Sequence, residues 1–421
     1  MNQRHFRGAS PSGQSRPFTY RKPAGKGGFS GGGSRGGYQG GHGGGNRRPG
    51  GGGFSQHINV SKFINKATIT EKTAHFVPEN TFTDFLIDPR LKTTIATKGY
   101  FVPTPIQDKA IPHILLGKDV VGIANTGTGK TAAFLIPLIN KVLKQPREKI
   151  LIVVPTRELA QQIEEEFKGF ATHMNMWAVC CVGGANIVAQ IKALSRPFNF
   201  IVGTPGRLRD LIDRRRINLS EYSTVVLDEA DRMLDMGFIN DIKFMVSQMS
   251  AKRHTLFFSA TMSREIEGLI KNFLTEPVMI SVKTGNTAEQ VEQDIIRVPL
   301  GKNKLDVLYE MLTKPHFNKV LIFGKTKHGV QRLAESLLQK GLKAEAIHGD
   351  KSQGQRQKAL KMFKEHHVNV LVATDVAARG LDISGISHVI NFDIPATYDD
   401  YVHRIGRTGR AGKKGVALTF V

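Results

Sequence analysis

The chain has 421 residues, enough for two or three domains, and a formal net charge of +23 that favours a polyanionic partner. The first thirty positions lack the apolar core of a signal peptide, and no apolar run is long enough to span a bilayer, so we expect no membrane partner. The two cysteines, Cys180 and Cys181, are neighbours and cannot form a disulfide framework. We therefore expect a cytoplasmic protein with reduced thiols.

Residues 1–56 are rich in Gly, Arg and Ser, and no acidic residue precedes Glu71, while seven Arg and four Lys do. Such a segment buries too little apolar surface to offset its ordering entropy, so we expect disorder. Aromatic residues recur among the arginines, as in Phe-Arg-Gly at 6–8 and Arg-Gly-Gly-Tyr at 35–38. Guanidinium groups bind phosphates and rings stack on bases, which favours an RNA-binding tail over a plain flexible one. A connecting segment, 57–81, follows.

From Phe82 onward the sequence alternates apolar runs with helical patterns and contains an internal repeat. Three apolar runs recur in the same order: 149–156 with 319–326, 199–204 with 369–374, and 223–228 with 387–393. Strands rich in β-branched residues without alternation suit parallel sheets covered on both faces. The repeat predicts an α/β fold of two similar domains, at 82–283 and 292–421, joined by a polar linker at 284–291.

Residues 124–131, Ala-Asn-Thr-Gly-Thr-Gly-Lys-Thr, follow one apolar run and precede a helical pattern. This is the strand–loop–helix context of a phosphate-binding loop, although Ala124 replaces its usual first Gly. Backbone N–H groups of the loop would face the phosphates, Lys130 would reach the β- and γ-phosphates, and Thr131 would bind Mg²⁺. The other loop residues predicted to contact nucleotide are Thr126, Gly127, Thr128 and Gly129.

The run at 223–227 ends in three carboxylates, Asp228, Glu229 and Asp231. Crowded carboxylates repel one another, so the cluster indicates a cation, a positioned water or basic partners, unless it is a solvated turn. The phosphate-binding loop favours a cation, a positioned water or basic partners over a solvated turn. Asp228 can hold the Mg²⁺ of a nucleotide, and Glu229 can orient or deprotonate the attacking water.

Together with these motifs, further residues in order resemble the DEAD-box ATP-dependent RNA helicases, named for Asp-Glu-Ala-Asp at 228–231. The resemblance runs from Phe82 to the end of the chain and implies two tandem RecA-like domains. It also implies that Tyr100 stacks on adenine, that Gln107 reads its edge, and that Phe82 belongs to the same motif. In the first domain, it implies that Ser259, Thr261 and Asp231 couple hydrolysis to strand separation.

The resemblance also implies RNA-binding residues on both domains and ATP-binding residues on the second. The RNA-binding residues would be Pro155, Arg157, Gly184, Thr204, Gly206, Arg207, Gln353, Arg356 and Thr374. On the second domain, Asp382 would bind ATP, His403 would act in coupling, and Arg407 and Arg410 would be arginine fingers. The chain stops at Val421, where this family usually adds another helix, so we expect a trimmed chain or a slightly incomplete second domain.

The resemblance implies an RNA-stimulated ATPase that uses ATP and Mg²⁺ to separate short RNA duplexes and remodel RNA or RNA–protein complexes. We expect RNA as the partner, read through its backbone and with room for protein cofactors, and a monomeric protein. One alternative is an ATP-gated RNA clamp or condensate scaffold in which unwinding is incidental. Another is a DNA-directed translocating helicase, which the adenine motif argues against.

Overall fold

The structure is a computed structural model that describes residues 63–64, 76–125, 127–282, 291–378, 383, 385–409 and 415–421. The predicted tail 1–56, most of the connecting segment and residues 284–290 of the predicted linker lie outside these ranges, as do Thr126, Asp382 and Arg410. None of the helices within the described ranges is both long and apolar enough to cross a membrane.

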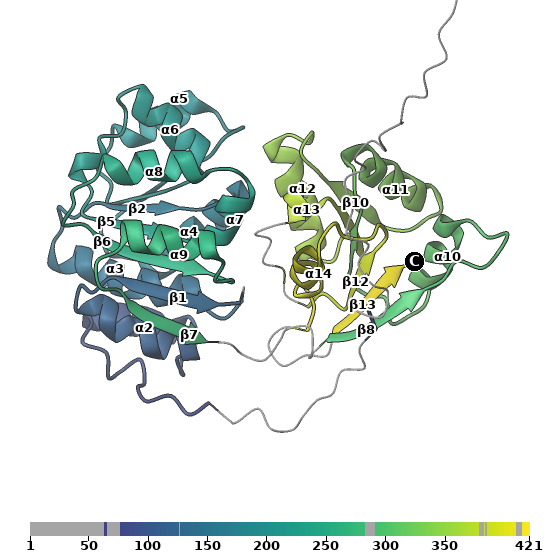
Figure 1. Ribbon diagram of the computed structural model, residues 1–421, viewed down its shortest axis with the longest axis horizontal. Helices are drawn as coiled ribbons and strands as arrows, with labels where there is room; N and C mark the ends of the chain where they lie inside the picture. Colours follow the sequence, from purple (N-terminus) through teal and green to yellow (C-terminus); the bar gives the residue numbers. More distant parts are fainter. Residues whose placement is uncertain are drawn as a thin grey trace, which may run out of the picture. The chain divides into compact units, whose positions relative to one another are not determined.

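The first domain contains a seven-stranded sheet in the order β3-β4-β2-β5-β6-β1-β7, and every strand pair is parallel (Figure 1). Its strands are β1 (Val120–Ala124), β2 (Ile150–Val153), β3 (Ala178–Cys181), β4 (Phe200–Gly203), β5 (Thr224–Leu227), β6 (His254–Ser259) and β7 (Val278–Val282). The central strands are buried on both faces, as their continuous apolar sequences predict.

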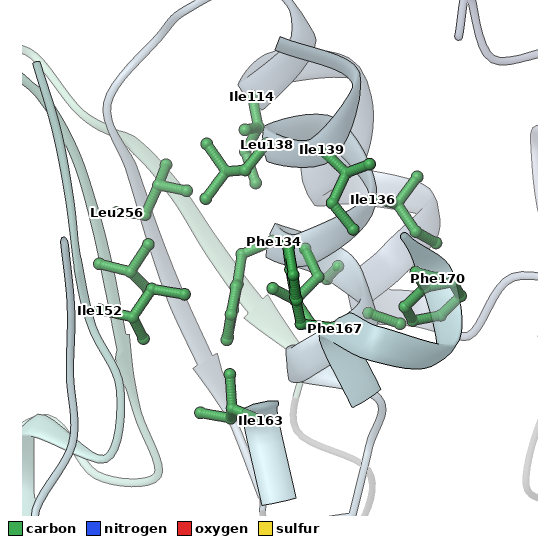
Figure 2. Packing of buried hydrophobic residues seen from close by; sticks show 14 of the residues in the cluster. Ile114, Phe134, Ile136, Leu138, Ile139, Ile152, Ile163, Phe167, Phe170 and Leu256 are labelled. Carbon is green, nitrogen blue, oxygen red and sulfur yellow. The ribbon is translucent and has the colours of Figure 1, made fainter. Parts of the chain in front are cut away.

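Helices cover both faces of this sheet. They are α1 (Pro89–Thr97), α2 (Pro105–Leu115), α3 (Lys130–Lys144), α4 (Arg157–Phe170), α5 (Ile187–Leu194), α6 (Pro205–Asp213), α7 (Ala230–Asp235), α8 (Ile239–Ser247) and α9 (Arg264–Phe273). Ile150 and Ile152 of β2 pack with α1 to α4, whereas Leu151 and Val153 pack with α6 to α9. Figure 2 shows the first of these cores, where Phe134 of α3 and Phe167 of α4 lie close to Ile152.

The second domain contains a six-stranded parallel sheet in the order β10-β11-β9-β12-β13-β8 (Figure 1). Its strands are β8 (Val291–Ile296), β9 (Val320–Phe323), β10 (Ala344–Ile347), β11 (Val370–Ala373), β12 (His388–Asn391) and β13 (Gly415–Phe420). Helices α10 (Lys304–Leu312) and α11 (Lys327–Gln339) pack on one face, and α12 (Gln353–Lys364) and α13 (Asp375–Ala378) pack on the other. Helix α14 (Tyr398–Ile405) follows β12.

The two sheets repeat one strand order, since β3-β4-β2-β5-β6 in the first corresponds to β10-β11-β9-β12-β13 in the second. The helices that follow the equivalent strands β2 and β9, which are α4 and α11, also begin in the same way. The Thr156 hydroxyl accepts a hydrogen bond from Leu159 N at the start of α4, and Thr326 accepts one from Gly329 N at the start of α11. The predicted α/β fold with two copies of one unit is therefore confirmed.

Candidate nucleotide and RNA site

The loop between β1 and α3 has the backbone of a phosphate-binding loop. Gly127 and Gly129 adopt φ angles of +85° and +91°, which residues with a Cβ rarely adopt. A Cβ on Gly129 would also collide with the side-chain amide of Gln107. The loop leads directly into the N-terminus of the 15-residue helix α3, where unpaired N–H groups and the helix dipole favour an anion.

Lys130 is the first residue of α3 and its side chain folds back over the loop. The residue is only 6% exposed, and its ammonium group donates a hydrogen bond to the Ala124 carbonyl at 2.9 Å. A buried ammonium group needs nearby negative charge or acceptors to offset its lost hydration. The loop therefore carries a desolvated cation at the place where phosphate groups would add that negative charge.

Asp228 and Glu229 lie at the C-terminal end of β5, and both side chains are buried. Burial raises the pKa of Asp228 to about 6, with Glu229 and Asp231 adding to the rise and Lys130 opposing it. Glu229 adopts the left-handed conformation with φ +52°, and its Oε2 atom is buried without a hydrogen-bond partner among the described residues. A strained backbone and an unsatisfied carboxylate oxygen together indicate a functional position.

A cavity of about 250 Å³ is lined both by the predicted phosphate-binding residues and by the carboxylate pair. Gly127, Gly129, Lys130 and Thr131 line it together with both carboxylates of the pair. No group of three or more His, Cys, Asp or Glu side chains in the described ranges could hold a metal on its own. One carboxylate and one hydroxyl in this cavity fit Mg²⁺, which keeps several waters and takes further oxygens from substrate phosphates.

Tyr100 also lines this cavity, and neighbouring side chains fix its ring. Its hydroxyl donates to Glu166 Oε1 at 2.8 Å, and its ring makes edge contacts with Phe170 and Phe82 at centroid distances of 5.4 and 6.1 Å. Phe82 is 4% exposed and belongs to the hydrophobic core. In this structure Phe82 therefore supports the Tyr100 ring from within the core.

Gln107 is 1% exposed and connects two parts of the site. Its Nε2 donates to the Gly129 carbonyl at 3.1 Å, and its Oε1 accepts from Thr104 N at 2.9 Å, at the start of α2. An amide group can form about two bonds through each of these atoms, so these two bonds leave one donor and one acceptor position, although Gln107 is not among the residues that line the cavity. The structure thus gives Gln107 a second task, which is to hold the phosphate-binding loop.

Asp231 connects the carboxylate cluster to the segment that follows β6. Its Oδ2 accepts hydrogen bonds from the backbone N–H groups of Ala260 and Thr261, both at 3.1 Å, and from the Thr261 hydroxyl at 3.2 Å. The Ser259 hydroxyl donates to the Thr261 carbonyl at 2.8 Å. The Asp231 carboxylate is therefore hydrogen-bonded directly to residues 260 and 261.

The predicted RNA-binding residues of the first domain lie near the C-terminal ends of β2, β3 and β4, where open parallel sheets bind ligands. Pro155, Arg157, Thr204, Gly206 and Arg207 line one groove. The guanidinium group of Arg157 lies directly against Gly184, where a Cβ would collide with it. Arg207 donates to Gln190 Oε1 at 2.9 Å, which fixes its direction.

In the second domain, Gln353 and Arg356 lie on the first turns of α12, and Thr374 follows β11. His403 lies on α14 and Arg407 follows that helix. Sequence reasoning did not single out Arg404, whose guanidinium group binds both carboxylate oxygens of Asp375 at 2.6 and 2.7 Å. Arg404 also donates to Asn391 Oδ1 and to the Asp393 carbonyl, so it anchors α14 to the sheet.

Besides Arg404, a second contributor to the site, Glu166, was not predicted from the sequence. Glu166, which holds the Tyr100 hydroxyl, lies 66 positions further along the chain, on α4. No local pattern distinguishes it from the other acidic residues of that helix. Arg404 had a detectable signal, because an arginine within an apolar helix face needs a carboxylate partner, and Asp375 follows a buried strand.

Two RecA-like domains, one with a phosphate-binding loop and a carboxylate pair, define the nucleoside-triphosphate-dependent helicase class. Residues 104–269 match the family model of the DEAD/DEAH box helicases, and residues 303–412 match that of the helicase conserved C-terminal domain. The chain is 48% identical over 343 residues to the DEAD-box ATP-dependent RNA helicase CshA of Bacillus subtilis, covering 81% of this chain and 69% of that protein. The chain belongs to the DEAD-box ATP-dependent RNA helicase family, as the sequence predicts.

A further relative and two solved structures are also similar to this chain. The ATP-dependent RNA helicase CshA of Listeria monocytogenes is 46% identical over 342 residues, which cover 81% of this chain and 66% of that protein. Among solved structures, Saccharomyces cerevisiae Dbp5 bound to RNA and ADP BeF3 is 29% identical, with a TM-score of 0.70 over 81% of this chain and 89% of that one. Mss116p bound to ssRNA and AMP-PNP is 30% identical, with a TM-score of 0.72 over 82% and 76%. The prediction of tandem RecA-like domains is confirmed.

Proposed function

We propose that this protein hydrolyses ATP with Mg²⁺ and uses the reaction to separate short RNA duplexes locally and to remodel RNA or RNA–protein complexes. The observation that carries the proposal is the single cavity that Lys130, Thr131, Asp228 and Glu229 line together. Tyr100 on its wall is suited to stack on adenine, and Gln107 retains hydrogen-bonding capacity for the base edge.

Each group in the cavity has a distinct task in this proposal. Lys130 would neutralise the β- and γ-phosphates, while Asp228 and Thr131 would hold Mg²⁺. When it is bound with ATP, Mg²⁺ supplies charge neutralisation to the phosphate oxygens. Glu229, with its unsatisfied oxygen, orients the attacking water and accepts its proton. Arg407 and Arg410 of the second domain would stabilise the negative charge that develops in the transition state, and Asp382 would be a further ligand of ATP.

RNA is the proposed second ligand, gripped through phosphates and 2′-hydroxyls by Arg157 and Arg207 of the first domain and Arg356 of the second. Hydrolysis would reach this surface through Asp231, whose carboxylate accepts hydrogen bonds from residues 260 and 261. We also propose that the protein acts as a monomer, with room for protein cofactors. A cytoplasmic location accords with its two free thiols.

A strand-separation assay tests the proposal, with a short RNA duplex that carries a single-stranded extension and an all-DNA duplex of the same sequence. We expect ATP-dependent separation of the RNA duplex only, and none by Glu229→Gln, which should retain ATP and RNA in a stable complex. Retention of RNA with ATP but without any strand separation by the wild type would favour the clamp alternative. Equal separation of the DNA duplex would favour the translocating DNA helicase.

A further inference from the structure

Phe63 is fully buried although it lies before the first domain in the sequence. Its ring lies 4.8 Å from the ring of Tyr401, with an angle of 60° between their planes. Val291, Ile405 and Ala417 complete the cluster, and all five side chains have no exposed surface. We call this group the Phe63 cluster. Apart from Phe63, its members come from β8, β13 and α14 of the second domain.

Ile64, the next residue, is 50% exposed. The two described residues of this segment therefore differ sharply, since one is inserted between elements of the second domain and the other faces solvent. A phenylalanine side chain contributes about 150–250 Å² of buried surface, which makes it an effective single anchor for an extended segment.

The Phe63 cluster supports α14, the helix that carries His403 and that Arg407 follows. Tyr401 and Ile405 are one helical turn apart on α14 and face the same side, while His403 projects about 200° from Tyr401. The Tyr401 hydroxyl donates to the buried Gln293 Oε1 at 2.8 Å. Arg404 holds a neighbouring face of α14 through Asp375.

Helix α14 has only eight residues, so its position depends on such tertiary contacts rather than on its own stability. We propose that Phe63 docks the N-terminal segment onto the second domain and acts as a positioning residue for α14, and thereby for His403 and Arg407. The positioning role rests on the proposed function of those two residues. The docking of Phe63 is independent of that proposed function, because its evidence is the burial of the Phe63 cluster.

Docking is tested without any activity measurement by placing the photo-crosslinking amino acid p-benzoyl-phenylalanine at position 63 of the full chain. Crosslinks should map to peptides from β8, α14 or β13 of the second domain. The same group at the exposed position 64 is the matched control and should crosslink to these peptides several-fold less. Crosslinks to the first domain, or equal yields from both positions, would overturn the docking.

The positioning role is tested by RNA-stimulated ATPase kinetics. Phe63→Ala should lower kcat up to about tenfold with little change in the KM for ATP, because the loop and Tyr100 belong to the first domain. Phe63→Leu should restore most of the rate, and Ile64→Ala should match the wild type. A folded Phe63→Ala protein with a lowered Tm but an unchanged kcat would make Phe63 a purely structural residue. If Arg407→Ala retains full kcat, the proposed role of Arg407 fails, whereas the crosslinks still report on docking.

Discussion

Asp228 lies 2% exposed at the end of β5, and burial raises its pKa to about 6, above the value of about 3.9 expected in the unfolded chain. The folded state therefore binds more protons than the unfolded state between about pH 4 and pH 6. Stability falls as the pH rises through this window and stays lower above it. At neutral pH the ionised Asp228 thus destabilises the nucleotide-free protein, which is typical of a group kept for function.

Replacing this carboxylate should stabilise the protein and inactivate it. We expect Asp228→Asn to raise the free energy of unfolding at pH 7.5 by about 1–3 kcal/mol, and the gain should shrink toward zero near pH 4. Urea unfolding of the nucleotide-free protein measures this difference, and ATP hydrolysis by the variant should be lost. Asp235→Asn, at an exposed position of the following helix α7, is the control and should change this free energy little. If the gain in the free energy of unfolding did not depend on pH, the ionisation of Asp228 could not be its cause.

Gln107 has one amide for two tasks, holding Gly129 and reading adenine. Gln107→Ala should therefore lower kcat/KM for ATP and narrow the preference for ATP over GTP, because both the loop contact and the base contact are lost. Gln107→Glu keeps an acceptor for Thr104 N but loses the N–H donor for Gly129 and for the base alike, so it should show the same two effects. Kinetics with both nucleotides provide the measurement, and equal use of GTP by the wild type would refute adenine recognition.

At the scale of elements, Arg404 is the side chain that fixes α14 to the second sheet. It is 3% exposed in its pair with Asp375 and has two further acceptors. Arg404→Ala should lower the free energy of unfolding by about 2–4 kcal/mol, since it leaves buried acceptors without a donor. Lys302→Ala breaks an exposed pair with Glu310 and should cost no more than about 0.5 kcal/mol in the same denaturant titration. Similar losses for both variants would argue against the anchoring role.

The sequence repeat predicted the strands that became β2, β4 and β5 and their counterparts β9, β11 and β12, because these are continuous apolar runs at the centres of their sheets. The edge strands β7 and β8 carry alternating or polar sequences, since one side of each is solvated, and their patterns are weaker. Sheet order and the burial of Phe63 depend on contacts between distant segments. Local patterns cannot predict such contacts, and the connecting segment 57–81 gave no sign of an anchor.

The candidate site also contains residues that the sequence could predict and contacts that it could not. Lys130, Asp228 and Glu229 were predictable because each lies directly at the end of a strand or the start of a helix, where a short motif fixes its place. The tie between Gln107 and Gly129 joins residues 22 positions apart, and that between Tyr100 and Glu166 joins residues 66 apart. These pairs form only when helices pack, so the sequence alone could not reveal them.

For the molecule as a whole, the basic tail should raise RNA affinity without changing the catalytic step. Deleting residues 1–56 keeps Phe63 and the whole candidate site. We expect a higher RNA concentration for half-maximal ATPase and a flatter salt dependence, because each lost phosphate contact removes about 0.7 from the log–log salt slope. The rate at saturating RNA should stay nearly the same. Unchanged RNA affinity at low salt would make the tail a passive spacer, and a collapsed saturated rate would assign it a role in catalysis.

In the proposed mechanism, RNA controls the hydrolysis of ATP in one cavity of the first domain. The most direct test of this control measures steady-state ATP hydrolysis under three conditions. These are no nucleic acid, single-stranded RNA, and DNA of the same sequence. We predict slow hydrolysis without nucleic acid, strong stimulation by RNA, little by DNA, and no RNA-stimulated hydrolysis by Glu229→Gln. Equal rates with and without RNA, or normal turnover by Glu229→Gln, would contradict the account.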